Sequence, residues 1–426
     1  MKITLWGINY APESIGIAPF NRELCEFLAG RGHDVTAVTS FAYYPHWRKQ
    51  FADRGRWHRR ESANGVRLHR CWCYVPAVVT TPGRIVHELS FGLVSMGRIL
   101  ALPRADVYVV VSPPLGLGFL AWIATTLKRS RFVFHVQDLQ PDAAVELGML
   151  RRGLLVRLLY GLERLAYAKA TKVSGISEGM IAAFDRKGVP AAKRVLLPNW
   201  LRMGLEVTPD PADRAGARRR FGVPEGNLLA IYAGNLGRKQ NLEIVIEAAG
   251  LLASRATEEP NRVTVIIAGD GAARPDLERR LQAQAGADVH LLPLLSEADY
   301  AALLGAADVA LITQCKGTGQ FFFPSKLLSV LAAGLPVVAV ADDDSELARA
   351  LRTGGFGLTV APADAAGLAS VLKLLAKSRA QLDAWSARTI WVDQFSRQNI
   401  LPRFEEMLLT ASRGLERVPT KMAMPA

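Results

Sequence analysis

The chain has 426 residues, of which half are hydrophobic and 21% are charged. This length exceeds what one compact core normally serves, so we expect two domains of about 200 residues each. The four cysteines show neither Cys-x-x-Cys spacing nor the nearby histidine pairs of a zinc module, and they do not suggest a disulfide framework. Composition therefore excludes a disordered chain, a small disulfide-stabilised domain and a zinc-finger protein.

The formal net charge of +13 is distributed unevenly along the chain. Residues 1–200 contain 27 Lys and Arg against 14 Asp and Glu, whereas residues 201–426 contain 25 of each kind. Two basic segments, residues 47–60 and 151–172, interleave cations with aromatic or leucine side chains. Such segments suit an anionic membrane surface, where each cation contributes on the order of 1 kcal/mol. A solvated surface helix is the alternative, and nucleic acid is a weaker one because no nucleic-acid motif accompanies the charge.

The first residues read as a strand that leads into a glycine loop, without the features of a signal peptide. The longest apolar run, residues 113–127, contains two glycines and is shorter than the roughly 20 residues that span a bilayer. We therefore expect a buried helix at this run. We also expect a cytoplasmic protein that associates peripherally with the inner face of the plasma membrane.

Strand-like apolar runs alternate with helical patterns along the whole chain. In the first half, strands are predicted at residues 3–8, 35–38, 107–111 and 132–136. In the second half, strands are predicted at residues 228–233, 263–268, 309–312 and 337–341. This alternation is typical of parallel sheets covered by helices on both faces, so we expect an α/β protein with two doubly wound Rossmann-like domains.

A polar, proline-rich stretch at residues 208–213 separates the two sets of strands. We expect the first domain to span residues 1–205 and the second to span residues 206–395. Residues 396–426 should form a C-terminal helix that packs back on the first domain and ends in a frayed tail. Ligands of such sheets bind at the carboxyl ends of the strands, so the loops at those ends hold the candidate functional residues.

Two loops of the first half carry candidate residues. Gly16 precedes a predicted helix, where a glycine lets the backbone approach a ligand closely. His135 and Asp138 lie at the end of the strand at 132–136 and are candidates for binding sugar hydroxyls or moving a proton. A satisfied core histidine and an ordinary turn are the alternatives for these positions.

Residues 324–338 are the most informative stretch of the second half. They predict a short helix that begins abruptly at Pro324, ends at Gly334 and leads into a buried strand. The free N–H groups of Ser325 and Lys326 and the Lys326 cation form a candidate diphosphate site. An ordinary helix cap is the alternative.

Three glycine-containing loops of the second half also lie next to predicted strands. The segment 233–240 holds glycines, an asparagine and two cations, which can bind a diphosphate and neutralise its charge as it leaves. The other two loops lie at residues 268–271 and 316–319. Simple turns and exposed surface cations are the alternatives. The residues of these loops expected to bind a phosphate-bearing ligand are Gly234, Asn235, Arg238, Lys239, Gly271 and Lys316.

The acidic segment 342–346 has two interpretations. Its clustered carboxylates suit Mg²⁺, but they also stand where a helix begins, and helix capping is favoured. The sequence contains no Ser-His-Asp elbow, zinc ligand set or Gly-x4-Gly-Lys-Ser/Thr loop. These absences weigh against a hydrolase and an ATPase.

Taken together, the loops resemble glycosyltransferase family 4, and in particular its colanic-acid-biosynthesis branch, the WcaI-type enzymes. The resemblance runs over nearly the whole chain. It rests on the segments GINYAPE (7–13) with Gly16, YYP (43–45), HVQD (135–138), SGIS (174–177), PNW (198–200), GNLG (234–237) with KQ (239–240), and PSKL (324–327).

This resemblance implies the GT-B fold, in which two Rossmann-like domains face each other across a cleft. The donor, a nucleotide-diphosphate sugar, would lie mainly on the second domain, and the acceptor on the first. The sugar would be transferred with retention of its anomeric configuration. Neither a metal nor another cofactor is expected.

The sequence departs from the family pattern at the donor site. The family's Glu-x7-Glu motif, registered on Gly334, falls on Phe321 and Ser329, which are not carboxylates. The family's Arg and Lys that grip the diphosphate fall near Asn235 and Gln240. Candidate substitutes for those two cations are Arg238, Lys239 and Lys326. The resemblance also places Asn199 and Ser329 among the donor-binding residues.

We therefore expect a glycosyltransferase that extends a lipid-linked saccharide during exopolysaccharide assembly. Its expected partners are a nucleotide sugar, a lipid-linked saccharide acceptor and an anionic cytoplasmic membrane surface, with no nucleic acid. One alternative is a nucleotide-sugar epimerase on the same fold. Another is a non-catalytic, membrane-associated scaffold, which the missing carboxylates would suit.

Overall fold

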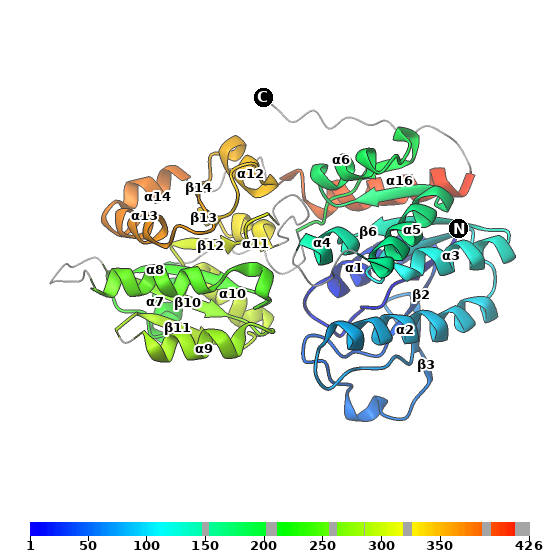
Figure 1. Ribbon diagram of the computed structural model, residues 1–426, viewed down its shortest axis with the longest axis horizontal. Coiled ribbons are helices and arrows are strands. Elements are labelled where there is room, and N and C mark those ends of the chain that lie inside the picture. The colour runs from blue at the N-terminus through cyan, green and yellow to red at the C-terminus, as the bar shows by residue number, and fades with distance from the viewer. Residues whose placement is uncertain are drawn as a thin grey trace. The chain divides into compact units, whose positions relative to one another are not determined.

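The computed structural model describes residues 1–146, 153–201, 211–254, 262–284, 286–317, 326–385 and 393–413. The chain divides into an N-terminal unit, Met1–Asn199 with Gln398–Ala426, and a C-terminal unit, Trp200–Arg397. Each unit is a parallel sheet flanked by helices (Figure 1). This architecture confirms the predicted α/β class with two Rossmann-like domains.

The N-terminal unit is built on a sheet whose strand order is β3-β4-β2-β1-β5-β6-β7-β8. Neighbouring strands pair in parallel except β3, which lies antiparallel to β4 at one edge. Its strands are β1 (Lys2–Trp6), β2 (Asp34–Ser40), β3 (His58–Ala63), β4 (Val66–Cys71), β5 (Val107–Ser112), β6 (Arg131–Val136), β7 (Lys172–Gly175) and β8 (Arg194–Leu196). Its helices are α1 (Ala18–Gly30), α2 (Thr81–Ala101), α3 (Gly116–Leu127), α4 (Gln140–Glu146), α5 (Leu154–Lys169), α6 (Glu178–Arg186) and α16 (Arg397–Arg413).

The strands predicted in the first half are all present, but β3, β4, β7 and β8 were not predicted. Strands β7 and β8 are only four and three residues long. Strands β3 and β4 lie together at one edge of the sheet. Their sequences, HRRESA and VRLHRC, carry charges at most positions and lack a continuous apolar run. The end of the basic segment 47–60 therefore belongs to a sheet edge.

In the described part of the chain, no helix has both the length and the apolar content needed to cross a bilayer.

Helix α16 packs on the N-terminal unit although it ends the described chain. Its Glu405 carboxylate accepts hydrogen bonds from Arg31 Nε at 3.1 Å and from His33 Nε2 at 2.9 Å. The buried ring of Phe404 meets the His135 ring edge-to-face, with centroids 5.0 Å apart. A polar anchor at the end of α1 and an apolar one beside β6 thus hold the helix in place.

The C-terminal unit has a fully parallel sheet of order β11-β10-β9-β12-β13-β14. Its strands are β9 (Leu228–Ala233), β10 (Val263–Ala268), β11 (Val289–Leu292), β12 (Val309–Thr313), β13 (Val337–Val340) and β14 (Gly357–Val360). Its helices are α7 (Pro211–Arg220), α8 (Glu243–Ser254), α9 (Arg274–Ala283), α10 (Glu297–Ala306), α11 (Lys326–Ala332), α12 (Glu346–Gly354), α13 (Ala365–Lys377) and α14 (Arg379–Trp385).

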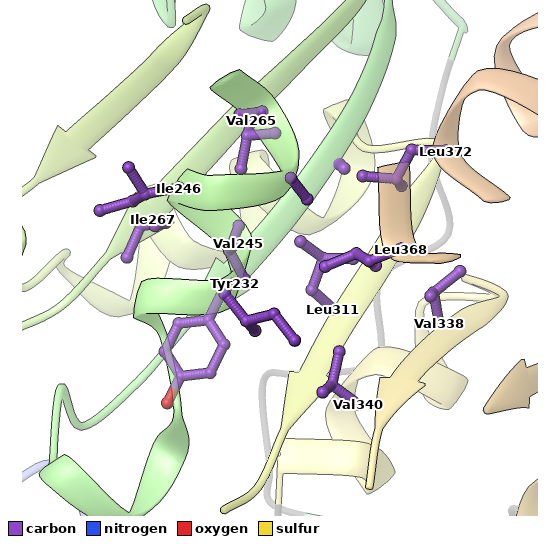
Figure 2. Close-up of a cluster of buried hydrophobic side chains, with 14 of the residues drawn as sticks. Tyr232, Val245, Ile246, Val265, Ile267, Leu311, Val338, Val340, Leu368 and Leu372 are labelled. Carbon is purple, nitrogen blue, oxygen red and sulfur yellow. The ribbon is translucent and has the colours of Figure 1, made fainter. Parts of the chain in front are cut away.

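A buried apolar cluster between this sheet and helices α8 and α13 fixes the strand ends of the C-terminal unit. Figure 2 shows side chains from β9, β10, β12 and β13 packed against those helices, with the Tyr232 hydroxyl directed away from the cluster. Each large side chain buried in this way contributes about 1.5–3 kcal/mol. The loops that follow β9 and β10 therefore start from a rigid base.

The acidic segment before α12 is a helix cap, as favoured from the sequence. Ser345 is the N-cap residue, and its side chain accepts a 3.1 Å hydrogen bond from Ala348 N. Glu346 occupies the first helical turn, where the helix dipole favours a negative charge.

Candidate functional site

The loops after β9 and β10 lie against each other at the carboxyl edge of the C-terminal sheet. Gly234 N donates to Ala268 O at 2.9 Å, Leu236 N to Asp270 O at 2.9 Å, and Ala273 N to Leu236 O at 2.8 Å. These bonds continue the pairing of the two strands beyond their ends. Because this edge is where α/β sheets bind ligands, the paired loops are a candidate ligand site.

Close contact between these loops requires glycine at positions 269 and 271. At Gly269, a Cβ atom would lie 1.8 Å from Gly234 O, and at Gly271 it would lie 2.6 Å from Leu236 O. Both residues also have positive φ angles, +146° and +156°. Only glycine fits these positions, so Gly271, which was predicted to contact the donor, has a packing reason to be there as well.

Lys326 is the central side chain of the site. Its Nζ lies 3.8 Å from the centre of the Tyr232 ring and donates a 2.6 Å hydrogen bond to the Tyr232 hydroxyl. That hydroxyl in turn donates to Asn235 O at 2.8 Å. A Cβ atom at Gly234 would lie 3.1 Å from Nζ, so a glycine there leaves room for the amine.

Burial, together with the nearby Lys239 cation, lowers the pKa of Lys326 to about 7. The Tyr232 ring face and hydroxyl offset part of the cost of a buried charge. The amine therefore stands near the midpoint of its titration at neutral pH. A diphosphate beside it would favour the charged form and would gain a charge-assisted hydrogen bond.

Three further predicted cations lie in adjoining segments. Arg238 is exposed, and within the described residues its guanidinium has no partner. Cys315 N donates to Lys239 O at 3.0 Å, and the Cys315 thiol donates to Arg238 O at 3.2 Å. These bonds join the cation pair to the loop after β12, where exposed Lys316 follows.

Two serines predicted to bind the donor have different outcomes. Ser325, together with Pro324 and Phe321, lies outside the described residues, and described helix α11 begins at Lys326. Ser329 is only 6% exposed; it donates to Lys326 O at 3.0 Å and shares a 2.9 Å hydrogen bond with Tyr300 OH. This arrangement tells against direct donor binding by Ser329 and favours a role in fixing α11.

In the N-terminal unit, His135 is part of a buried polar chain. Its Nδ1 lies 2.9 Å from Ser174 Oγ, and its Nε2 lies 2.8 Å from Gln137 Nε2. Gln137 and Asn199 exchange two amide hydrogen bonds of 3.0 Å. Because the Gln137 amide nitrogen can only donate, His135 accepts at Nε2 and carries its proton on Nδ1.

Burial lowers the pKa of His135 to about 3, so the ring is neutral. Both ring nitrogens are occupied by protein partners, which favours the core-histidine alternative over the expected catalytic role. The side chain of Asn199 is likewise engaged inside the N-terminal unit and is 7% exposed. The contacts of both residues with Gln137 hold the loop after β6 in place.

Asp138 and Gly16 remain available at the carboxyl edge of the N-terminal sheet. Asp138 is half-buried just beyond β6, and its carboxylate has no partner among the residues that the structure describes. Gly16 is exposed with φ +68°, and a Cβ atom there would lie 3.6 Å from the Tyr44 ring. Both positions are therefore compatible with the roles expected from the sequence.

Sequence reasoning missed two residues that organise these edges. The buried Glu13 carboxylate accepts hydrogen bonds from Tyr43 N at 3.0 Å, Tyr44 N at 2.9 Å and Asn9 Nδ2 at 2.9 Å, which ties the loops after β1 and β2 together. Burial raises the pKa of Glu13. Tyr232 was missed because its strand, LLAIYA, reads as uniformly buried.

Comparison with known proteins shows the family of the chain. Residues 16–200 match the glycosyl transferase 4-like domain, and residues 227–378 match the domain of glycosyl transferases group 1. Over 413 residues the chain is 31% identical to the Escherichia coli K12 protein assigned as the colanic acid biosynthesis glycosyl transferase WcaI. That alignment covers 95% of this chain and 98% of the relative.

Two solved structures share the fold. Sucrose-phosphate synthase from Thermosynechococcus elongatus matches with a TM-score of 0.76 and 17% identity, covering 97% of this chain and 99% of that one. HepE from Anabaena, in complex with UDP-glucose, matches with a TM-score of 0.68 and 18% identity, covering 96% of this chain and 100% of that one. The chain therefore belongs to the glycosyltransferases of GT-B fold that join a 4-like N-terminal domain to a group 1 C-terminal domain.

Proposed function

We propose that this protein transfers a sugar from a nucleotide-diphosphate donor to a lipid-linked saccharide, with retention of configuration, during assembly of a colanic-acid-like exopolysaccharide. The overall similarity to WcaI supports the biosynthetic role. The single observation that carries the donor assignment is the Lys326 amine, which lies over Tyr232 and against Gly234 at the carboxyl edge of the C-terminal sheet.

The donor diphosphate would bind beside Gly234, with its charge neutralised by Lys326 and by the neighbouring cations Arg238, Lys239 and Lys316. A diphosphate of two negative charges needs cations or backbone N–H groups wherever it leaves water. Lys326 supplies a cation that is already desolvated and oriented. The presence of UDP-glucose in HepE, which has the same fold, supports a nucleotide sugar as the donor.

The reaction would break the bond between the anomeric carbon and the diphosphate oxygen, and the electron pair would leave with the diphosphate. The acceptor hydroxyl oxygen would form its new bond on the same face, and its proton would pass to an oxygen of the leaving phosphate. The lysine and arginine cations would stabilise the charge that develops on that group, so no metal is required in this scheme. Asp138 would orient the sugar, and Gly16 would allow the loop after β1 to approach it closely.

The exposed side chains of the N-terminal unit support action at a membrane surface. Among the large hydrophobic side chains that the structure describes as exposed, all except Leu374 belong to this unit. Helices α2, α3 and α5 pack side by side (Figure 1), and their exposed apolar residues are Val86, Leu89, Leu93, Leu100, Leu127, Leu154, Leu155 and Leu158. With the basic surplus of residues 1–200, this layer suits the headgroup region of an anionic bilayer.

A transfer assay tests the proposal. Purified protein is incubated with radiolabelled UDP-glucose, UDP-galactose or GDP-mannose and a bacterial lipid extract that contains lipid-linked saccharides. We expect label to enter the lipid fraction with one of these donors, and the new linkage to keep the donor's anomeric configuration. Conversion of the donor to an epimer in the absence of lipid, or binding of no nucleotide sugar at all, would contradict the proposal.

A further inference from the structure

A basic groove lies at the amino ends of strands β1, β2 and β4 in the N-terminal unit. Its volume is about 430 Å³, and its lining includes Lys2, Arg60, Arg67, Arg98 and Arg104. Asp34 is the one carboxylate among the lining residues. The volume falls within the range of sites that hold small molecules.

Internal pairing neutralises only part of this charge. Arg67 is paired with Asp34, and Arg98 Nε donates to His69 Nδ1 at 3.1 Å. Arg60 and Arg104 are exposed, and their guanidinium groups have no hydrogen-bond or ion-pair partner in the described part of the chain. Five cations line this one groove with a single carboxylate, so a bound anion would reduce their mutual repulsion.

Two histidines, His69 and His58, lie beside these cations. His69 Nδ1 also lies 3.1 Å from His58 Nε2. Burial and the cations around it, Arg98 first among them, lower the pKa of His69 to about 4, and burial lowers that of His58. A buried imidazole that stays neutral in this way adds no further positive charge and can accept the Arg98 hydrogen bond.

We propose that this groove binds a phosphate group, carried either by a membrane lipid or by a soluble phosphate ester. Guanidinium groups bind phosphate oxygens through paired N–H donors, and two of them stand unpaired here. The groove adjoins the C-terminal end of α2, where Arg98 and Ala101 line it.

This site is separate from the proposed acceptor site. Lys2 and Asp34 are the first residues of β1 and β2, whereas Gly16 and Asp138, which are proposed to act in transfer, follow the carboxyl ends of their strands. Ligand binding in the groove would therefore add to transfer chemistry without occupying its site. Absence of sugar transfer would leave the phosphate site untouched. Absence of phosphate binding would likewise leave the proposed sugar transfer untouched.

Binding is measured by calorimetry without any nucleotide sugar, using dihexanoyl phosphatidylglycerol below its micelle concentration and sn-glycerol 3-phosphate as probes. The test variant is Arg60→Gln with Arg104→Gln, and the matched control is Arg56→Gln with Arg129→Gln. All four arginines are exposed in the same unit, so the charge change is identical and both variants should fold. Unchanged melting temperatures check this.

We expect the wild type and the control variant to bind at least one probe, and the groove variant to bind it about tenfold more weakly. Tighter binding of the short-chain lipid than of glycerol phosphate would identify a lipid source, and equal binding a soluble phosphate. The inference would be overturned if the wild type bound neither probe, or if the control lost as much affinity as the groove variant.

Discussion

The amine of Lys326 lies on the face of the Tyr232 ring, 3.8 Å from its centre, and also reaches the ring's hydroxyl at 2.6 Å. The two residues come from different elements, the start of α11 and the end of β9. Their contact holds a cation at the carboxyl edge of the sheet in a partly desolvated place. Because the Lys326 ammonium is already partly desolvated, it can bind a diphosphate without first losing a full hydration shell.

Replacing Lys326 with glutamine should weaken binding of the donor. A hydrogen bond to a charged group contributes about 1.5–3 kcal/mol, which corresponds to roughly 10- to 150-fold in affinity. The measurement is titration calorimetry with the nucleotide sugar that most raises the melting temperature. Lys377→Gln, an exposed position near the end of α13, is the control and should bind normally. Equal affinity of the two variants would remove Lys326 from the donor site.

Donor affinity should fall as the pH rises through about 7. The pKa of Lys326 is lowered to about 7, so the amine is cationic below this pH and neutral above it. The diphosphate diester of a nucleotide sugar keeps its charge over this window. Dissociation constants are measured from pH 6 to pH 8.5. Lys326→Arg keeps its charge at every pH and should flatten the profile; an equally steep profile in that variant would assign the dependence to another group.

The contact between Gly269 and Gly234 should make alanine costly at position 269. A Cβ atom there would lie 1.8 Å from Gly234 O, and φ is +146°. We expect Gly269→Ala to lower the free energy of unfolding by at least about 2 kcal/mol. At Gly216, within α7, a Cβ atom meets nothing within 4 Å, so Gly216→Ala should stabilise by about 0.5–1 kcal/mol. Urea denaturation measures the free energy of unfolding of both variants. Equal values for the two variants would contradict the close packing at Gly269.

Vesicle binding should depend on the exposed leucines of α2. Leu89 and Leu93 are 58% and 69% exposed, and each would contribute about 1.5–3 kcal/mol if inserted among lipid chains. The double variant Leu89→Glu with Leu93→Glu should therefore bind anionic vesicles at least about tenfold more weakly in cosedimentation. Leu374→Glu changes a side chain of the C-terminal unit that is 57% exposed, and it should bind like the wild type. Binding that is the same in both variants would exclude α2 from the membrane contact.

His135 should act on stability rather than on the pH profile of catalysis. Its pKa is about 3 in the folded protein and near 6.5 in the unfolded chain. Between these values the unfolded chain takes up a proton that the folded protein does not, so this group lowers stability as the pH falls below 6.5. The loss is on the order of 1 kcal/mol per pH unit.

Urea denaturation at pH 7.5 and pH 5 checks the role of His135. His135→Asn should be less stable than the wild type at pH 7.5, and its stability should fall less between the two pH values. An equal fall in both proteins would contradict the neutral, buried ring. A catalytic pH profile that loses a group near neutral pH in the variant would return His135 to a direct role in the reaction.

Much of the fold could be predicted from the apolar runs, because parallel strands buried on both faces have continuous hydrophobic sequences. Strand β3 could not, since it lies antiparallel at an edge and carries charges. At the site, the Gly234 loop and Lys326 follow from strand-loop-helix order. Their contact with Tyr232, and the hydrogen bonds that occupy His135 and Ser329, depend on packing between distant segments, which local pattern does not reveal.

The most direct test of the donor site is a crystal structure with a nucleoside diphosphate bound, UDP or GDP, chosen by which of the two raises the melting temperature. We predict that a phosphate oxygen lies within hydrogen-bond distance of Lys326 Nζ, beside Gly234. A diphosphate that binds elsewhere, with the Lys326 amine still directed only to Tyr232, would contradict the account.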